Sequence, residues 1–193
     1  MNMKMTMRAV VMVAVCGVMA LKAMGGENQV AIYTVGKVDT GLQSRVSDLV
    51  SGQLLAVTNA GVLSQSGTLA NIQELGKAKV RSNTVAVLIL ADRVAGMTER
   101  HVLAQDKVVV VNVGTIGKGL KANDEQKMTE ALVRRVEKES LGGLAFVLGM
   151  DRCVLPTCVL FPTPTIDELD LKGRGLCPPC MGKWEARMGA GRE

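Results

Sequence analysis

Four cysteines near the end of the chain have the spacing of a metal site. They form two close pairs, Cys153 with Cys158 and Cys177 with Cys180, and eighteen residues separate the pairs. Two short pairs of this kind can enclose one zinc ion in a closed tetrahedron of thiolates. The two prolines between Cys177 and Cys180 restrict the backbone and favour that geometry. The pattern predicts one structural zinc ion per chain, held by the segment 151–183.

Two other interpretations of the cysteines are open. If the protein is exported, it meets an oxidising compartment, where the same four residues could form two disulfides in any of three connectivities. A thioredoxin-like redox role for the Cys177–Cys180 pair is a second alternative. The position of the pair disfavours this role, because we expect it in an irregular tail and not at the start of a helix after a strand.

The first 25 residues have the composition of a secretory signal peptide. Lys4 and Arg8 precede an apolar run over 9–21, and small residues follow at Ala23 and Gly25. This order of charge, apolar run and small residues is typical of a cleaved leader, and the run is short for a membrane span. We expect cleavage near Gly25. The mature protein would then be periplasmic or extracellular, with no attachment to a membrane.

The predicted leader accounts for much of the positive charge of the chain. The full sequence has a net charge of +5, and residues 1–25 carry three basic side chains and no acidic one. The remaining 26–193 has 20 basic and 18 acidic side chains, a net charge of +2. Nucleic-acid binding requires a clustered basic face, so this balance gives it no support. Cys16 is removed with the leader, which leaves only the four cysteines of the C-terminal pattern.

Apolar patterning over 26–193 predicts one α/β domain. Runs of β-branched and apolar residues indicate strands at 30–35, 61–65, 84–90, 102–104 and 108–113, the last two as an edge hairpin or adjacent strands. Helical periods indicate helices at 40–55, at 69–76 and from an N-cap at Asn123 to about Leu148. The sequence thus predicts a small mixed sheet with two or three helices, followed by an irregular C-terminal lobe fastened by zinc.

The last predicted helix contains two unfavourable residues. Gly142 and Gly143 are adjacent in its interior, where each glycine costs about 1 kcal/mol relative to alanine. Helical propensity does not explain this pair. Before it, Glu137, Lys138 and Glu139 are expected to form the solvated polar face of the helix.

The region from Arg135 to Lys183 resembles the archaemetzincin family of zinc metallopeptidases. That family carries an active-site helix with the pattern HExxHxxGxxHC, then x4-C-x-M, then a C-x2-C pair. With Cys153 and Cys158 placed on the first two family cysteines, no gap is needed. The conserved family glycine then falls on Gly149 and the Met-turn methionine on Leu160. The resemblance implies a metzincin-like layout, with the glycine-containing helix beneath the sheet.

The same register places none of the family's catalytic residues in this chain. The three zinc histidines fall on Gly142, Phe146 and Arg152, and the general-base glutamate falls on Gly143. A metzincin centre needs three imidazoles and a carboxylate, whereas this chain has one histidine, His101. We therefore expect a non-catalytic protein that retains the structural zinc.

Such a protein could still bind a peptide or protein ligand along an edge strand. Two alternatives differ from this hypothesis. The first is an active peptidase with a non-standard site rebuilt around Glu139 and Asp151, which would hold a second zinc ion. The second is a disulfide-fastened exported protein without metal.

Overall fold

The computed structural model of the protein describes residues 28–64, 66–120 and 124–189. The predicted signal peptide lies outside these ranges. Within them, no helix combines the length and the apolar character that crossing a membrane requires.

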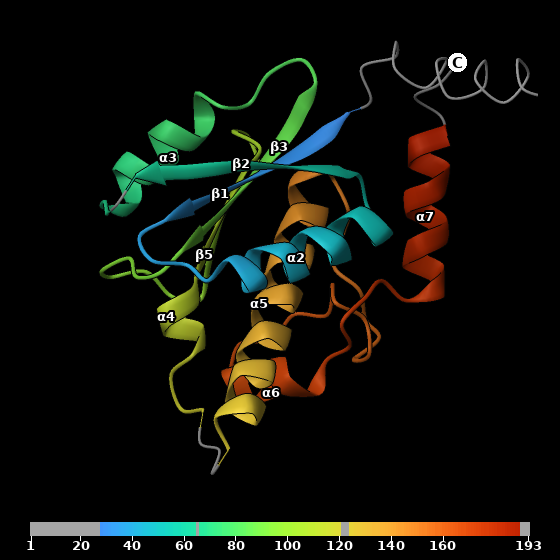
Figure 1. Cartoon of the computed structure of the whole chain (residues 1–193). Coiled ribbons are helices and arrows are strands. Elements are labelled where there is room, and N and C mark those ends of the chain that lie inside the picture. The colour runs from blue at the N-terminus through green and yellow to red at the C-terminus, as the bar shows by residue number, and fades with distance from the viewer. Residues whose placement is uncertain (1–27, 65, 121–123, 190–193) are drawn as a thin grey trace, which may run out of the picture.

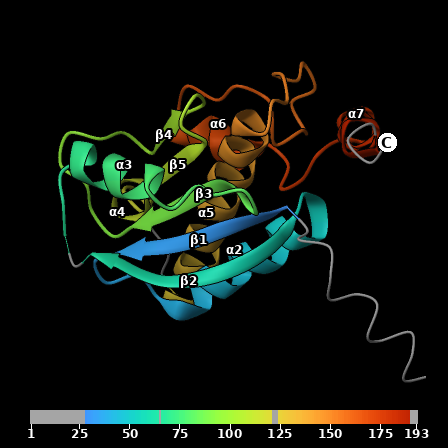
Figure 2. The same ribbon diagram turned by 90° about the horizontal axis from the view of Figure 1, so that it is seen from above.

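A five-stranded mixed sheet forms the centre of the protein (Figures 1 and 2). Its strands are β1 (Gln29–Val35), β2 (Ala56–Ser64), β3 (Thr84–Ala91), β4 (Arg100–Leu103) and β5 (Val108–Asn112). They lie in the order β2-β1-β3-β5-β4, with only β4 antiparallel to its neighbour. The predicted edge hairpin is therefore β4 and β5. The strand expected at 61–65 is longer and begins at Ala56. Strand β5 ends at Asn112, one residue before the predicted end, because Val113 starts a short helix.

Helices cover both faces of the sheet. Helices α2 (Thr40–Gln53) and α5 (Glu125–Val147) pack on one face, and α3 (Leu69–Lys77) packs on the other. The larger core lies on the α5 face and includes Val109 and Val111 of β5. The smaller core lies on the α3 face and includes Val108 and Val110. This alternation follows from the period of two in a strand. It means that β5 is buried on both faces.

Helix α5 is continuous through its glycine pair. Its N-cap is Asp124, one residue after the predicted Asn123, which lies outside the described ranges. The Asp124 carboxylate accepts hydrogen bonds from the backbone N–H groups of Gln126 and Lys127. At the other end, Gly149 has a φ of 90° and follows the last turn, which closes with hydrogen bonds from the N–H groups of Gly149 and Met150. This Schellman-type ending explains why glycine is needed at position 149.

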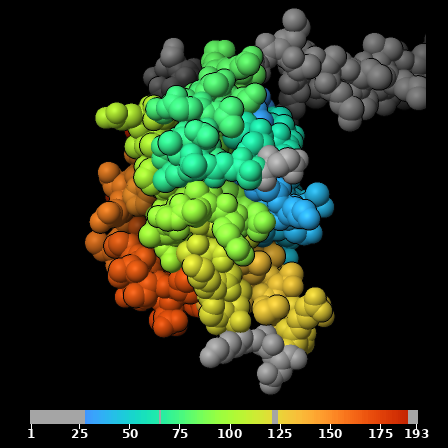
Figure 3. All heavy atoms as spheres, turned by 90° about the vertical axis from the view of Figure 1, so that its left-hand side faces the viewer, coloured from blue at the N-terminus to red at the C-terminus, as the bar shows by residue number. Residues whose placement is uncertain are grey.

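The C-terminal segment contains more helix than its composition suggests. The expected irregular lobe includes α6 (Ile166–Leu171) and α7 (Pro178–Gly189), and a further short helix, α4 (Val113–Ile116), follows β5. Helix α6 begins with a capping box between Thr165 and Glu168, a local signal in a segment predicted to be a loop. In Figure 3 the orange and red atoms of the segment after α5 lie beside green atoms from the middle of the chain.

Charged residues of α5 join this segment to the rest of the protein. Glu137, Lys138 and Glu139 were expected in a solvated face, but all three are buried. The prediction fails because the C-terminal segment crosses the helix at this point and supplies a partner to each of the three residues. Arg174 pairs with Glu137 at 2.7 Å, and the Lys138 ammonium donates to the carbonyls of Leu169 and Asp170.

An ion pair between α5 and α6 should make the stability of the protein depend on pH. The buried Arg135 guanidinium donates two hydrogen bonds, of 2.7 and 2.6 Å, to the half-exposed carboxylate of Asp170. These bonds hold the pKa of Asp170 below its usual value of 3.8. A lowered folded pKa stabilises the protein above the unfolded pKa, and that contribution is lost as the pH falls through the folded value.

We expect Asp170→Asn to lower the free energy of unfolding at neutral pH by about 1–2 kcal/mol, given the exposure of the carboxylate. The difference from wild type should shrink below about pH 4, where the unfolded carboxyl is protonated. Urea unfolding at neutral and acidic pH measures it. Asp167→Asn, at an exposed position of the same helix, is the control. A loss that is equal at both pH values would contradict the assignment.

Candidate metal centre and the adjacent cleft

The four cysteines meet in one cluster. Their sulfur atoms all lie within 4.8 Å of one another, and the Sγ atoms of Cys153 and Cys177 are 3.7 Å apart. A tetrahedron with Zn–S bonds of about 2.3 Å has edges of about 3.8 Å, close to this separation. A disulfide would bring two sulfurs to about 2.0 Å, and all four residues are free thiols in this structure. The cluster is consistent with a structural zinc ion and gives no support to the disulfide alternative.

Local turns position the four sulfurs. Cys153 follows the glycine turn at the end of α5, and Cys158 closes a turn in which its N–H donates to the Leu155 carbonyl. Cys177 lies immediately before α7, and Cys180 lies in the first turn of that helix. The pair is therefore at a helix start, contrary to the prediction of an irregular tail. Because the other two cysteines complete the cluster, this position does not by itself indicate a redox pair.

The buried sulfurs would need a cation beside them to be ionised. Burial raises the pKa of the Cys158 and Cys180 thiols above their ordinary value, so buried thiolates would be unfavourable without a positive partner. The Cys177 pKa is lowered, chiefly by the backbone N–H of Cys180. A zinc ion bound by the four residues would supply the missing charge and keep them deprotonated.

Arg100 occupies the space next to the glycine pair. A Cβ atom on Gly142 would lie 3.0 Å from the Arg100 Nη1 atom and 3.1 Å from the carbonyl oxygen of Val159. A Cβ atom on Gly143 would lie 2.6 Å from a methyl group of Val109 and 2.9 Å from the Arg100 Cδ atom. The two glycines thus give the arginine of β4 room to cross the helix. Close packing against Arg100, Val109 and Val159 is the physical reason for glycine at these two positions.

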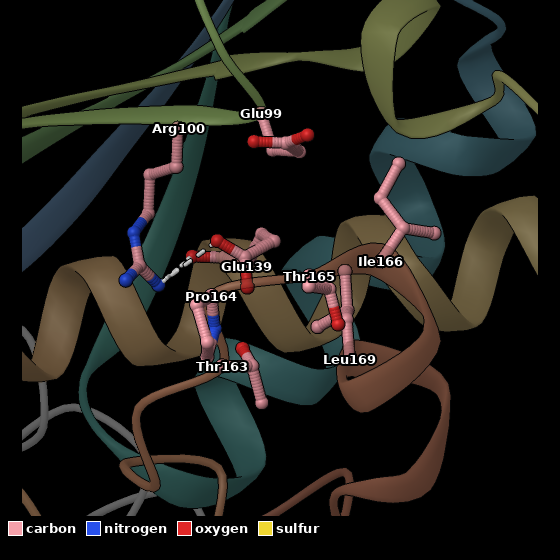
Figure 4. Close-up of a pocket in the computed structure, with 8 residues that line it drawn as sticks. All are labelled: Glu99, Arg100, Glu139, Thr163, Pro164, Thr165, Ile166 and Leu169. Atoms are coloured by element: carbon pink, nitrogen blue, oxygen red, sulfur yellow. Dashed lines mark hydrogen bonds and ion pairs between the residues drawn. The ribbon is translucent and has the colours of Figure 1, made fainter.

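The guanidinium of Arg100 forms an ion pair with Glu139, as the close-up in Figure 4 shows. Its Nη1 atom lies 3.2 Å from a carboxylate oxygen of Glu139 and also donates to the backbone carbonyl of that residue at 3.3 Å. The Lys172 ammonium contacts the other carboxylate oxygen at 3.5 Å. The guanidinium carbon of Arg100 lies 5.8 Å from the ring centre of Phe146, within cation–π range. One buried carboxylate therefore faces two cations.

The residues of the proposed non-standard peptidase site do not come together. Glu139 lines a pocket beside Arg100. Asp151 is exposed and lines a different pocket with Cys153 and Arg187. His101 pairs with Val110 across the β4–β5 ladder. Directly opposed residues share a face of the sheet, so the imidazole lies on the α3 side, away from α5.

Over the described ranges, the four cysteines are the single group of three or more histidine, cysteine or acidic side chains placed to hold a metal. Leu160, at the family's methionine position, is buried in the larger core.

The two cations that contact Glu139, namely Arg100 and Lys172, were not identified from the sequence. Arg100 was not singled out because its partners on α5 lie about forty positions away along the chain. Lys172 lies in a segment without helical periodicity, so its burial gave no signal. A signal for Arg100 was available in retrospect, since a buried glycine pair in a long helix indicates close approach by another element.

The packing of the glycine pair makes a prediction about stability. We expect Gly143→Ala to destabilise the protein by about 1–2 kcal/mol, because overpacking against the stiff Val109 exceeds the gain in helical propensity. Gly182→Ala is the matched control, since a Cβ atom at this helical position meets nothing within 4 Å. The control should be neutral or stabilising by up to about 1 kcal/mol. Thermal unfolding of the two variants compares them, and a stabilised Gly143→Ala would show that Val109 and Arg100 do not fill this space.

The fold matches that of solved archaemetzincins. The archaemetzincin of Methanopyrus kandleri superposes with a TM-score of 0.66 at 17% identity, covering 86% of this chain and 98% of that one. A zinc-dependent peptidase from Methanocorpusculum labreanum gives a TM-score of 0.63 at 18% identity, covering 80% and 99%. The archaemetzincin of Archaeoglobus fulgidus, solved with malonate, gives 0.56 at 18% identity with the same coverage. This chain therefore has the archaemetzincin fold.

Similarity in sequence is local. An archaemetzincin from Pyrococcus furiosus is 35% identical over 60 residues, which is 31% of this chain and 31% of that protein. The match thus spans less than a third of the relative. No model of a known protein family matches this chain.

Proposed function

We propose that this protein is an exported member of the archaemetzincins that has lost the catalytic zinc centre, holds one structural zinc ion and acts by binding a peptide or protein. The observation that carries the proposal is the position of Arg100. Its side chain crosses α5 at Gly142 and Gly143, where the family places a zinc histidine and the general base. A guanidinium is cationic at any physiological pH and would repel a zinc ion there.

Within the described ranges, the lack of side chains that could bind a catalytic zinc ion at this position supports the same conclusion. The chain has one histidine in total, and it lies on the other face of the sheet. Glu139, the buried carboxylate nearest to the glycines, is engaged by Arg100 and Lys172. A carboxylate whose two oxygens are already engaged by cations is poorly placed to activate a water molecule. The structural zinc would fix the C-terminal segment that forms one wall of the cleft.

Peptide hydrolysis is the test of this proposal. Purified protein is incubated with unstructured peptides, with and without added zinc, beside a sample treated with a chelator. We expect no cleavage in any sample. Cleavage that the chelator abolishes would overturn the proposal in favour of a peptidase with a non-standard site.

Export has its own test. If the leader is removed as proposed, the intact mass of protein recovered from producing cells should correspond to a chain starting at Gly26. A chain that still carries residues 1–25 would contradict this part of the proposal.

A further inference from the structure

A cavity of about 540 Å³ lies beside the glycine pair, and its wall is unusual in composition. Three cationic side chains line it: Arg100, Arg152 and Lys172. Both phenylalanines of the chain, Phe146 and Phe161, line it as well. No acidic side chain is among the lining residues, which all belong to the described part of the chain. The cavity thus combines positive charge with an apolar surface.

Carboxylates balance the positive charge of this cavity incompletely. Glu139 contacts two of its three cations from the neighbouring pocket, through oxygens 3.2 Å from Arg100 and 3.5 Å from Lys172. Arg152 is exposed, and over the described ranges it forms no ion pair. Two of the three cations therefore share one carboxylate, and Arg152 has none among the described residues. Lys172 is held there although it is buried, and burial lowers its pKa, so a second anion would relieve an unfavourable charge.

The shape of the surroundings favours one kind of anion. Arginine side chains bind carboxylates through paired hydrogen bonds, and the phenylalanine rings offer contact to an apolar group attached nearby. Arg100 is also the first residue of β4, which is the edge strand of the sheet. An extended peptide that adds to an exposed sheet edge can place its end at a fixed position along the edge strand.

We propose that this cavity binds the C-terminal carboxylate of a peptide whose last side chain is apolar. The peptide extends along β4, its carboxylate lies among Arg100, Arg152 and Lys172, and its last side chain contacts Phe146 and Phe161. This inference rests on the proposed function, since it requires that no catalytic metal is bound beside the cavity. It specifies the class of ligand that the cavity binds.

The test compares a free carboxylate with an uncharged end. The probe is a hexapeptide of glycine and serine residues that ends in leucine, prepared as the free acid and as the amide. Chemical-shift changes in the zinc-loaded protein measure both affinities. We expect the free acid to bind at least tenfold more tightly than the amide, with shifts centred on the cavity. Equal affinities, or no binding of the acid, would overturn the inference. N-acetyl-leucine tests the source of the carboxylate, since binding as tight as that of the peptide would show that a small acid suffices.

Arg152→Gln provides the matching variant, because Arg152 is exposed and pairs with no described carboxylate. The preference for the acid should fall at least threefold in this variant, and Arg81→Gln, at an exposed position in the loop before β3 and outside the cavity lining, should leave it unchanged. Zinc content is measured on each sample, because loss of zinc would instead assign Arg152 to the thiolate cluster. After the binding experiment the peptides are recovered and examined for cleavage. Cleavage or a second zinc ion would refute the proposed function, whereas intact peptides with no preference for the acid would refute only this inference.

Discussion

Replacement of Cys158 by serine is expected to abolish zinc retention and to release the C-terminal segment from the core. Cys158 is fully buried and belongs to the larger core, together with Cys177, Cys180 and Trp184. Structural zinc sites contribute on the order of 10 kcal/mol in small zinc-binding peptides, comparable with the whole stability of a domain. A hydroxyl does not replace a thiolate ligand, so the effect should be the largest of any single substitution considered.

Trp184 reports this change directly. It is the single tryptophan of the chain, it is 4% exposed, and its indole N–H donates to the carbonyl of Leu54 at 3.3 Å. Release of α7 should expose the indole and shift its fluorescence to longer wavelength. Chelation of the wild-type protein should produce the same shift. Val154→Ser is the control, since this neighbouring side chain is 87% exposed and should change neither zinc content nor fluorescence. A Cys158→Ser variant with buried Trp184 and normal stability would refute a structural role for the cluster.

The second large effect is expected at Glu139. Glu139→Gln leaves Lys172, whose side chain is 3% exposed, and Arg100 without their shared carboxylate. Removing one partner of a buried ion pair costs about 3–5 kcal/mol, because a buried charge is left uncompensated. Denaturant unfolding measures the loss. Glu130→Gln makes the same substitution on the same helix, where Glu130 forms half-exposed pairs with Arg45 and Arg134, and should cost at most about 1 kcal/mol.

The pH dependence of the Glu139→Gln variant distinguishes charge from packing. Burial already lowers the pKa of Lys172 below 10.5, and loss of Glu139 should lower it further. A lysine with a lowered folded pKa binds fewer protons in the folded state, so stability rises with pH between the folded value and 10.5. The variant should therefore regain stability at alkaline pH. Lys172→Met in the same background should also recover part of the loss. If the loss of unfolding free energy in Glu139→Gln is the same at every pH, and always at least as large as that of Glu130→Gln, the cause is a packing defect instead.

Much of the framework follows from local sequence signals. The buried strand at 84–90 has a continuous apolar run, and such a run in an α/β chain places it in the interior of a parallel sheet. The structure confirms β3 between β1 and β5. The cysteine spacing predicted a cluster, and the sulfurs do meet. These features depend on residue type and spacing alone, which one sequence records.

The parts that were wrong depend on contacts between distant segments. Glu137, Lys138 and Glu139 have the charge of a solvated surface, and only the crossing of the C-terminal segment makes them interior. Helix α6 has only six residues, and the prolines and glycines in and around α6 and α7 hide their periodicity. The filling of the cleft by Arg100 combines both problems, because it joins an edge strand to a helix and ends on a buried carboxylate. The glycine pair was the one local sequence signal of the position of Arg100.

The central claim is that the four-cysteine site is present and the catalytic site is not. The metal content of freshly purified protein tests it most directly. We expect one zinc ion per chain, held by Cys153, Cys158, Cys177 and Cys180. Two zinc ions per chain would contradict it, since the second would occupy a catalytic centre that Arg100 is inferred to exclude.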